Sequence, residues 1–183
     1  MNATELSCDD PEPPSSNLNL LLDVDGDVDN AMIPSSDSIS TWVRHAVTGV
    51  PGFDSTVVYE VSVSVVTEPQ MQTLNRNYRD KNSPTNVLSF PSNMPTLPAS
   101  ENSASHLALG DVVLCHSVIV SEAEAQKKTV AEHWAHMIVH SVLHLFDYDH
   151  EQDAAAESME ALEVTLLEGL SIPNPYQRSF ESE

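Results

Sequence analysis

The chain has 183 residues and carries 28 acidic side chains against 7 basic ones, a formal net charge of −21 with histidine neutral. This length suits one domain with a sizeable core, and the charge excludes a nucleic-acid binder with an overall basic surface. Residues 1–43 hold nine acidic residues and no basic one, and residues 147–183 hold ten acidic residues and one basic one. Residues 44–146 carry a net charge of only −3, so a local basic site in this middle part is still compatible with the composition.

The sequence shows neither a basic, apolar leader nor a run long enough to span a bilayer, so we expect a soluble, cytoplasmic protein. Two cysteines are too few for a disulfide framework, and Cys115 in its apolar run is expected to be buried. Residues 1–16 are acidic and rich in proline and serine, which predicts a disordered tail. We expect a single domain over residues 17–176 and a short C-terminal tail over residues 177–183.

Hydrophobic periodicity predicts both strands and helices within this domain. Alternating apolar residues indicate strands at 18–23, 57–66, 86–90 and 107–115, and the last is apolar enough for burial on both faces. Apolar residues at spacings of three and four indicate a first helix that Ser36 or Asp37 caps and that Pro51 and Gly52 end. The same spacings indicate helices at 68–78, from Ser117 onward, at 130–146 and at 153–170. The expected fold class is α+β, with a single mixed β-sheet of about four strands packed with helices.

Five of the eight histidines fall in the segment HWAHMIVHSVLHLFDYDH, residues 133–150. His140 and His144 are four apart, so a helix places both imidazoles on one face. His150 follows beyond the expected helix end, where a returning chain can bring a third nitrogen to the same point. Three neutral nitrogens suit a tetrahedral Zn²⁺ with one open position. The spacing therefore predicts a zinc site on the central histidine-bearing helix.

Two other interpretations of this segment remain. His133, His136 and His140 form a rival set along one helix, but their nitrogens converge poorly because the helix is rigid. The spacing also matches the zinc helix of the metzincin proteases, HExxHxxGxxH, in which a glutamate acts as general base. Ser141 occupies that position here and cannot act as a base, so a zinc metallopeptidase-like hydrolase is the less favoured enzyme.

Three segments, in the same order, resemble the YbeY family. HSVLHLFDYDH resembles the family signature HGxLHLxGYDH, YRDKNSPTNVLSFP at residues 78–91 resembles YRxxxxPTxVLSFP, and LGDVVL at residues 109–114 resembles LGDIxI. The similarity covers roughly residues 55–176. Ser141 and Asp147 each stand where the signature has glycine, and neither change removes an expected ligand. Asp147 must turn left-handed after the helix, a conformation that aspartate tolerates better than most residues.

The resemblance implies a metal-dependent endoribonuclease that cleaves single-stranded RNA, acting in maturation of the 3′ end of 16S ribosomal RNA and in ribosome quality control. It implies one zinc ion per chain held by His140, His144 and His150, with Arg79 as the catalytic arginine. We expect metal-activated water to attack a phosphodiester that Arg79 holds.

The residues themselves support a role for Arg79, because a guanidinium can hold a phosphate through two parallel hydrogen bonds. Arg76, Arg79 and Lys81 are three of only seven basic residues and lie within six positions of one another. Asp111 and Asp149 are candidates to orient a metal-binding histidine, and a structural role at a turn or strand end is an equally supported alternative for Asp111.

The implied partners are ribosomal RNA and ribosomal particles, with ribosome-assembly proteins as further candidates and no membrane. A non-catalytic, zinc-containing ribosome-assembly factor is the second alternative, although three ligands leave the open position that a catalytic zinc requires. Three histidines also suit nickel or copper. The sequence does not determine the oligomeric state.

Overall fold

The computed structural model describes residues 18–28, 32–99, 104–148 and 153–176, which form an α+β fold with one four-stranded sheet and five helices. The strands are β1 (Leu18–Val24), β2 (Val57–Val66), β3 (Val87–Pro91) and β4 (Ser105–Cys115). The helices are α1 (Ser36–Gly49), α2 (Glu68–Arg79), α3 (His116–Ala125), α4 (Val130–Leu145) and α5 (Asp153–Gly169). The expected tails, residues 1–16 and 177–183, lie outside the described residues.

The sheet is mixed, as the sequence predicts. Its strand order is β1-β2-β4-β3, in which β1, β2 and β4 run parallel to one another and β3 runs antiparallel to β4. Parallel neighbours require crossover connections, and α1 supplies the one between β1 and β2. Because β3 is the last strand in this order, one of its sides is not paired with another strand of the described sheet. The candidate site described below lies at this edge.

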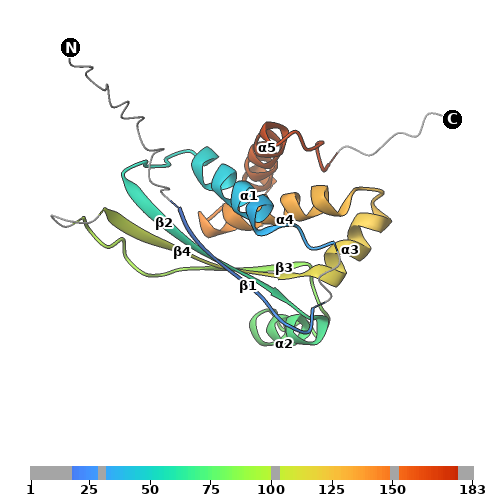
Figure 1. The fold of residues 1–183 in the computed structure, drawn as a ribbon. Coiled ribbons are helices and arrows are strands. Elements are labelled where there is room, and N and C mark those ends of the chain that lie inside the picture. Colours follow the sequence, from blue (N-terminus) through green and yellow to red (C-terminus); the bar gives the residue numbers. More distant parts are fainter. Residues whose placement is uncertain (1–17, 29–31, 100–103, 149–152, 177–183) are drawn as a thin grey trace, which may run out of the picture.

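The two faces of the sheet are covered unequally (Figure 1). α1, α4 and α5 lie on one face, whereas α2 lies on the other face near one end of the strands. The main core fills the first face, and α4 lies at its centre with residues such as Trp134, Ile138 and Leu143 fully buried. A second, small cluster of Met71, Leu88 and Cys115 lies beneath α2, and the burial of Cys115 agrees with expectation.

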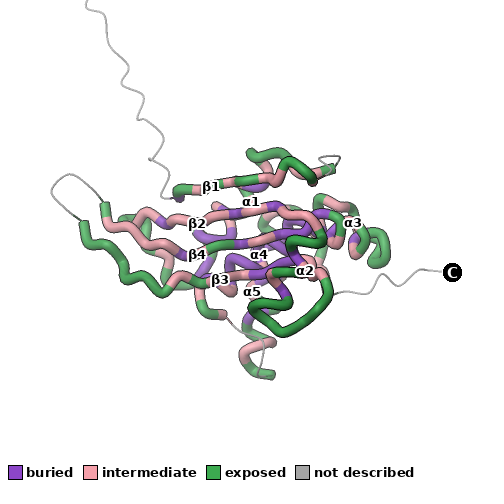
Figure 2. The backbone as a smooth tube through the Cα atoms, turned by 90° about the horizontal axis from the view of Figure 1, so that it is seen from below, coloured by how far each residue is buried: buried purple, intermediate pink, exposed green. Residues whose placement is uncertain are grey.

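Two details differ from the sequence predictions. β4 is not buried along both faces: Val112 and Leu114 face the core, but Asp111 is exposed because α2 covers only the last part of the strand. Figure 2 shows exposed and intermediate residues along the uncovered part of the sheet. The N-cap of α1 is Ser35 rather than Ser36 or Asp37, because the Ser35 hydroxyl accepts a hydrogen bond from the Ser38 amide at 3.2 Å.

A bulge in β4 sets the path of the β3 edge. Glu60 of β2 pairs with Ala108 while the next residue, Val61, pairs with Gly110, so Leu109 is the extra residue. Gly110 has φ of 134°, and a Cβ added there would lie 2.1 Å from the carbonyl oxygen of Phe90. Only glycine fits this contact between the two backbones.

We therefore expect Gly110→Ala to lower the free energy of unfolding by at least about 2 kcal/mol, because neither backbone can move away without breaking the β3–β4 pairing. Chemical denaturation followed by circular dichroism measures this change. Gly26→Ala is the matched control, since no atom lies within 4 Å of its added Cβ. Equal stability of the two variants would contradict the explanation.

Candidate active site

The central helix α4 presents a row of histidines towards the β3 edge. The helix begins with a capping box in which the Thr129 hydroxyl accepts from the Glu132 amide at 3.1 Å and the Glu132 carboxylate accepts from the Thr129 amide at 2.8 Å. Packing against α1, α3, α5, β3 and β4 then holds the helix in place. Side chains on such a rigid helix keep their relative positions when a ligand binds.

His140 and His144 meet through their Nε2 atoms, which lie 3.0 Å apart. The Nδ1 of His140 donates to the Glu163 carboxylate at 2.8 Å, and the Nδ1 of His144 donates to the carbonyl oxygen of Tyr148 at 2.8 Å. Both partners are acceptors only, so each Nδ1 carries its proton and each ring turns its Nε2 to the same point. A cation placed between the two Nε2 atoms would be bound by both rings.

This arrangement fits a zinc ion. Two nitrogens on a tetrahedral zinc, each about 2.0–2.1 Å from the metal, lie about 3.3 Å apart, close to the separation of the two Nε2 atoms. Histidine ligands of zinc also commonly donate the other ring N–H to a carboxylate or a backbone carbonyl, as both rings do here. The expected third ligand, His150, lies outside the described residues. Among the residues that are described, no three histidine, cysteine or carboxylate side chains form a complete metal-binding group.

A buried carboxylate holds His140 in place. Glu163 of α5 is fully buried and accepts hydrogen bonds from His140 and from the Tyr176 hydroxyl. Burial acts to raise the pKa of Glu163, but its interactions with His140, Tyr176 and His136 together outweigh this effect, so the pKa lies below its ordinary value. Burial and the Glu163 charge both raise the pKa of Tyr176, which keeps its phenol protonated as a donor.

The rival histidine set is dispersed. His133 donates from Nε2 to Glu122 on α3 at 2.8 Å, away from the pair that His140 and His144 form. The ring centroid of His136 lies 6.0 Å from that of His133 and 6.3 Å from that of His140. The centroids of His140 and His144 are closer, at 4.5 Å. Burial lowers the pKa of His136 to about 4, so this ring is neutral at pH 7. His136 lines the site cavity.

Arg79 reaches the same cavity from the other side of the sheet. The cavity, of about 300 Å³, is lined by residues of α2, β3, α4 and the segment after α5: Arg79, Asn86, Val87, Ser89, His136, Met137, His140, His144 and Tyr176. Arg79 is the last residue of α2, and the buried Asn75 holds the following turn by donating to the Ser83 carbonyl at 2.7 Å. The structure thus brings Arg79 together with His140 and His144, whereas Arg76 and Lys81 do not line this cavity.

The two departures from the family signature are accommodated. Ser141 is fully buried and its hydroxyl donates to the Met137 carbonyl at 2.6 Å, so it offers neither a base nor a nucleophile for peptide hydrolysis. Asp147 has φ of 61°, the expected left-handed conformation. Its amide donates to the His144 carbonyl at 3.1 Å and the Tyr148 amide donates to Leu143 at 3.1 Å, which is a Schellman ending of α4.

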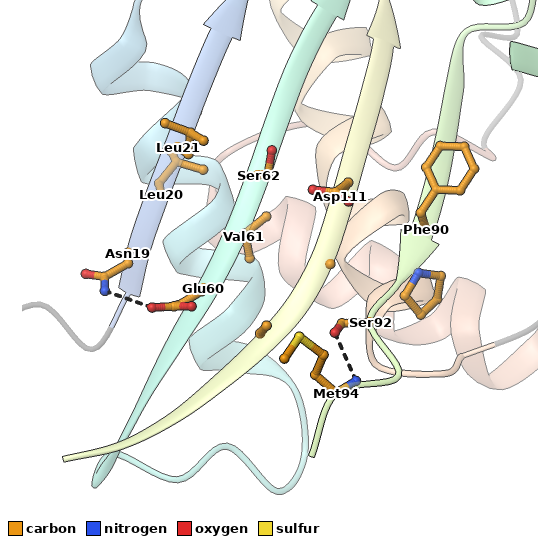
Figure 3. A pocket seen from close by; sticks show the side chains of 13 residues that line it. Asn19, Leu20, Leu21, Glu60, Val61, Ser62, Phe90, Ser92, Met94 and Asp111 are labelled. Atoms are coloured by element: carbon orange, nitrogen blue, oxygen red, sulfur yellow. Dashed lines mark hydrogen bonds between the residues drawn. The ribbon is translucent and has the colours of Figure 1, made fainter. Parts of the chain in front are cut away.

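A larger cavity lies elsewhere and has different chemistry. It measures about 590 Å³ on the uncovered face of the sheet (Figure 3), where Leu21, Glu60, Phe90 and Asp111 are among its lining residues. Its lining includes two carboxylates and no basic side chain or histidine, so it repels phosphate. Asp111 points to this face, away from α4, so the prediction that it orients a metal-binding histidine is wrong. Asp149 lies outside the described residues.

The three remaining histidines have partners outside the site. His45 contacts the Leu166 carbonyl at 3.0 Å, His106 contacts Glu60 at 3.2 Å, and His116 accepts from the Trp134 indole at 3.1 Å. The sequence predicts all three as surface or internally satisfied histidines.

Sequence reasoning missed Glu163 and Tyr176. A signal for Glu163 was present, because Met159, Glu163 and Leu166 follow one another at spacings of four and three, so the glutamate lies within the apolar stripe of α5. A charged residue at the centre of such a stripe needs a buried partner. No comparable pattern marks Tyr176.

Comparison with known proteins identifies the family. The family model described as Endoribonuclease YbeY matches residues 27–171. The chain belongs to the YbeY endoribonuclease family. The YbeY endoribonuclease of Alcanivorax borkumensis is 44% identical over 144 residues, which cover 78% of each chain. The solution structure of TM1509 from Thermotoga maritima, described as the target protein VT1, shares the fold with a TM-score of 0.50 and 18% identity. That match covers 90% of this chain and 100% of the other.

Membership of the YbeY family makes the chain an RNA-hydrolysing enzyme. In the part of the chain for which a structure is described, no helix has the length and apolar character that a membrane span requires.

Asp147 provides a test of the α4 ending. We expect Asp147→Gly to raise the free energy of unfolding by about 0.5–1 kcal/mol, because glycine adopts the left-handed conformation without the steric cost of a Cβ. Asp147→Ala retains the Cβ without the local polar contacts of aspartate and is expected to be slightly less stable than the parent. Thermal and chemical unfolding measure both changes; a glycine variant no more stable than the parent would argue against strain at this position.

Proposed function

We propose that this chain is a zinc-dependent endoribonuclease that cleaves single-stranded RNA during maturation of the 3′ end of 16S ribosomal RNA and in ribosome quality control. We propose further that it acts in the cytoplasm on ribosomal particles, through a single domain over residues 17–176 flanked by tails at residues 1–16 and 177–183. Family membership supports RNA as the substrate. The observation that carries the catalytic proposal is the single cavity lined by Arg79, His140 and His144.

In this proposal His140, His144 and His150 hold the zinc ion. When bound, zinc supplies a Lewis acid and lowers the pKa of water to about 7. The Nδ1 atoms of His140 and His144 donate hydrogen bonds to the Glu163 carboxylate and the Tyr148 carbonyl, respectively. Both Nε2 atoms are therefore left to bind the metal through their lone pairs.

Arg79 has a separate task at the opposite wall of the cavity. Its guanidinium binds the phosphodiester and offsets the charge that develops on the phosphoryl oxygens in the transition state. Ser89 of β3 lines the same cavity and offers a hydroxyl for a phosphate or ribose oxygen. The substrate is thus held between the end of α2 and the histidine face of α4.

The two tasks can be separated by substitution. We expect His144→Ala to abolish both zinc content and RNA cleavage, and Arg79→Glu to abolish cleavage while zinc content stays at that of the parent. Metal analysis and cleavage of a single-stranded RNA oligonucleotide measure the two properties. Arg76→Glu on the same helix makes the same charge change outside the cavity, and His106→Ala removes a histidine from the uncovered face. Full cleavage by either purified test variant would exclude the proposed site.

Glu163 is expected to strengthen zinc binding through His140. Glu163→Gln keeps the size of the side chain but removes the negative charge, and should weaken zinc binding about 10- to 100-fold. Competition with a chromophoric chelator measures the affinity, and circular dichroism checks the fold. The control Glu160→Gln changes an exposed carboxylate of the same helix and should stay within about twofold of the parent. Unchanged affinity in Glu163→Gln would show that the carboxylate does not act on the metal site.

A further inference from the structure

The segment that follows α5 is held in a defined path against α4. Ser171 has a left-handed φ of 60°, and the Ile172 amide donates back to the Leu167 carbonyl at 2.9 Å, so the chain reverses directly after the helix. Lys128 then donates from Nζ to the Pro175 carbonyl at 3.0 Å. The Asn174 side chain accepts from the Tyr176 amide at 2.8 Å. These contacts place Tyr176 in the wall of the cavity that Arg79 lines.

Tyr176 is anchored at one end and exposed at the other. Its hydroxyl donates to Glu163, whose side chain is only 1% exposed, yet Tyr176 itself is 45% exposed. Because the hydroxyl is held at a buried carboxylate, the exposure of this residue lies in its ring and backbone rather than at its polar tip, the reverse of the usual arrangement for a tyrosine. His136 meets this ring edge to face, with centroids 5.9 Å apart, and restricts its orientation further.

An aromatic ring fixed beside a phosphate-binding arginine is the combination that binds single-stranded nucleic acid. Proteins hold such strands by pairing basic side chains with the phosphates and by stacking unpaired bases on aromatic rings. We infer that Tyr176 forms a nucleobase-binding subsite, in which its ring stacks on a base next to the phosphodiester held by Arg79. This inference rests on the proposed function, because it requires the cavity to accept RNA.

The other exposed tyrosine serves as a matched control. Tyr78 is 66% exposed and precedes Arg79 on α2, but it does not line the cavity. Its ring packs edge to face on Phe90 at a centroid distance of 4.9 Å. Loss of this ring removes an exposed aromatic group near Arg79 without changing the cavity wall.

The experiment compares Tyr176→Phe, Tyr176→Leu and Tyr78→Leu in the full chain. Tyr176→Phe and Tyr176→Leu both lose the hydroxyl that donates a hydrogen bond to Glu163. The difference between the two variants therefore measures the effect of the aromatic ring alone. The probes are short single-stranded RNAs of one sequence, each with the fluorescent base 2-aminopurine at a different position. The fluorescence of 2-aminopurine is quenched when this base stacks on an aromatic ring. Quenching is recorded on mixing, before cleavage, and KM and kcat are then measured on the same RNA. Zinc content is determined for each variant.

We expect Tyr176→Leu to lose the quenching and to raise KM about 5- to 100-fold relative to Tyr176→Phe, with equal zinc content in both. Tyr78→Leu should match the parent. If Tyr176→Leu still cleaves RNA and shows the same quenching and the same KM as Tyr176→Phe, the proposed base-binding subsite is wrong. The proposed function is then unaffected. Failure of the parent to cleave RNA, with quenching that still depends on the Tyr176 ring, would instead reject the proposed function and retain the base-binding subsite.

Discussion

A buried carboxylate cannot remain charged without donors around it, and Glu163 meets this requirement by binding two segments to each other. One oxygen accepts from His140 on α4 and the other from Tyr176 after α5. The same two contacts orient the Nε2 of His140 towards His144 and turn the tyrosine ring to the cavity. The need of the buried Glu163 carboxylate for hydrogen-bond donors thus couples the packing of α5 to the geometry of the candidate metal site.

The position of β3 explains why residues from both faces of the sheet share one cavity. β3 is an edge strand, so no further strand of the described sheet separates α4 on one face from the end of α2 on the other. The Gly110 bulge brings the β4 backbone close to Phe90 and sets the course of this edge. A wider sheet, with another strand beyond β3, would place Arg79 and the histidines on opposite sides of a barrier.

The strong negative charge of the chain does not exclude an RNA substrate, because residues 44–146, which supply Arg79, His140 and His144, carry a net charge of only −3. Surface charges act over a Debye length of about 8 Å at physiological salt. The buried carboxylate of the site, Glu163, is matched by His140 and Tyr176. Farther along α4, His133 donates to the partly exposed Glu122, and this hydrogen bond lowers the pKa of Glu122. Binding therefore depends on a few directed contacts around Arg79 and less on attraction of RNA to the whole surface.

The sequence alone determined the α+β class, the mixed four-stranded sheet and the family, because these depend on local periodicity and on motifs that are contiguous along the chain. His140 and His144 were also accessible to sequence reasoning, since a spacing of four residues fixes their relation on a helix. Only the tertiary structure decided that Arg79 lies in the same cavity, that Asp111 faces away from it and that Glu163 and Tyr176 complete it. Those relations join residues up to about a hundred positions apart, and they arise from which face of the sheet each helix covers, which no local pattern in the sequence encodes.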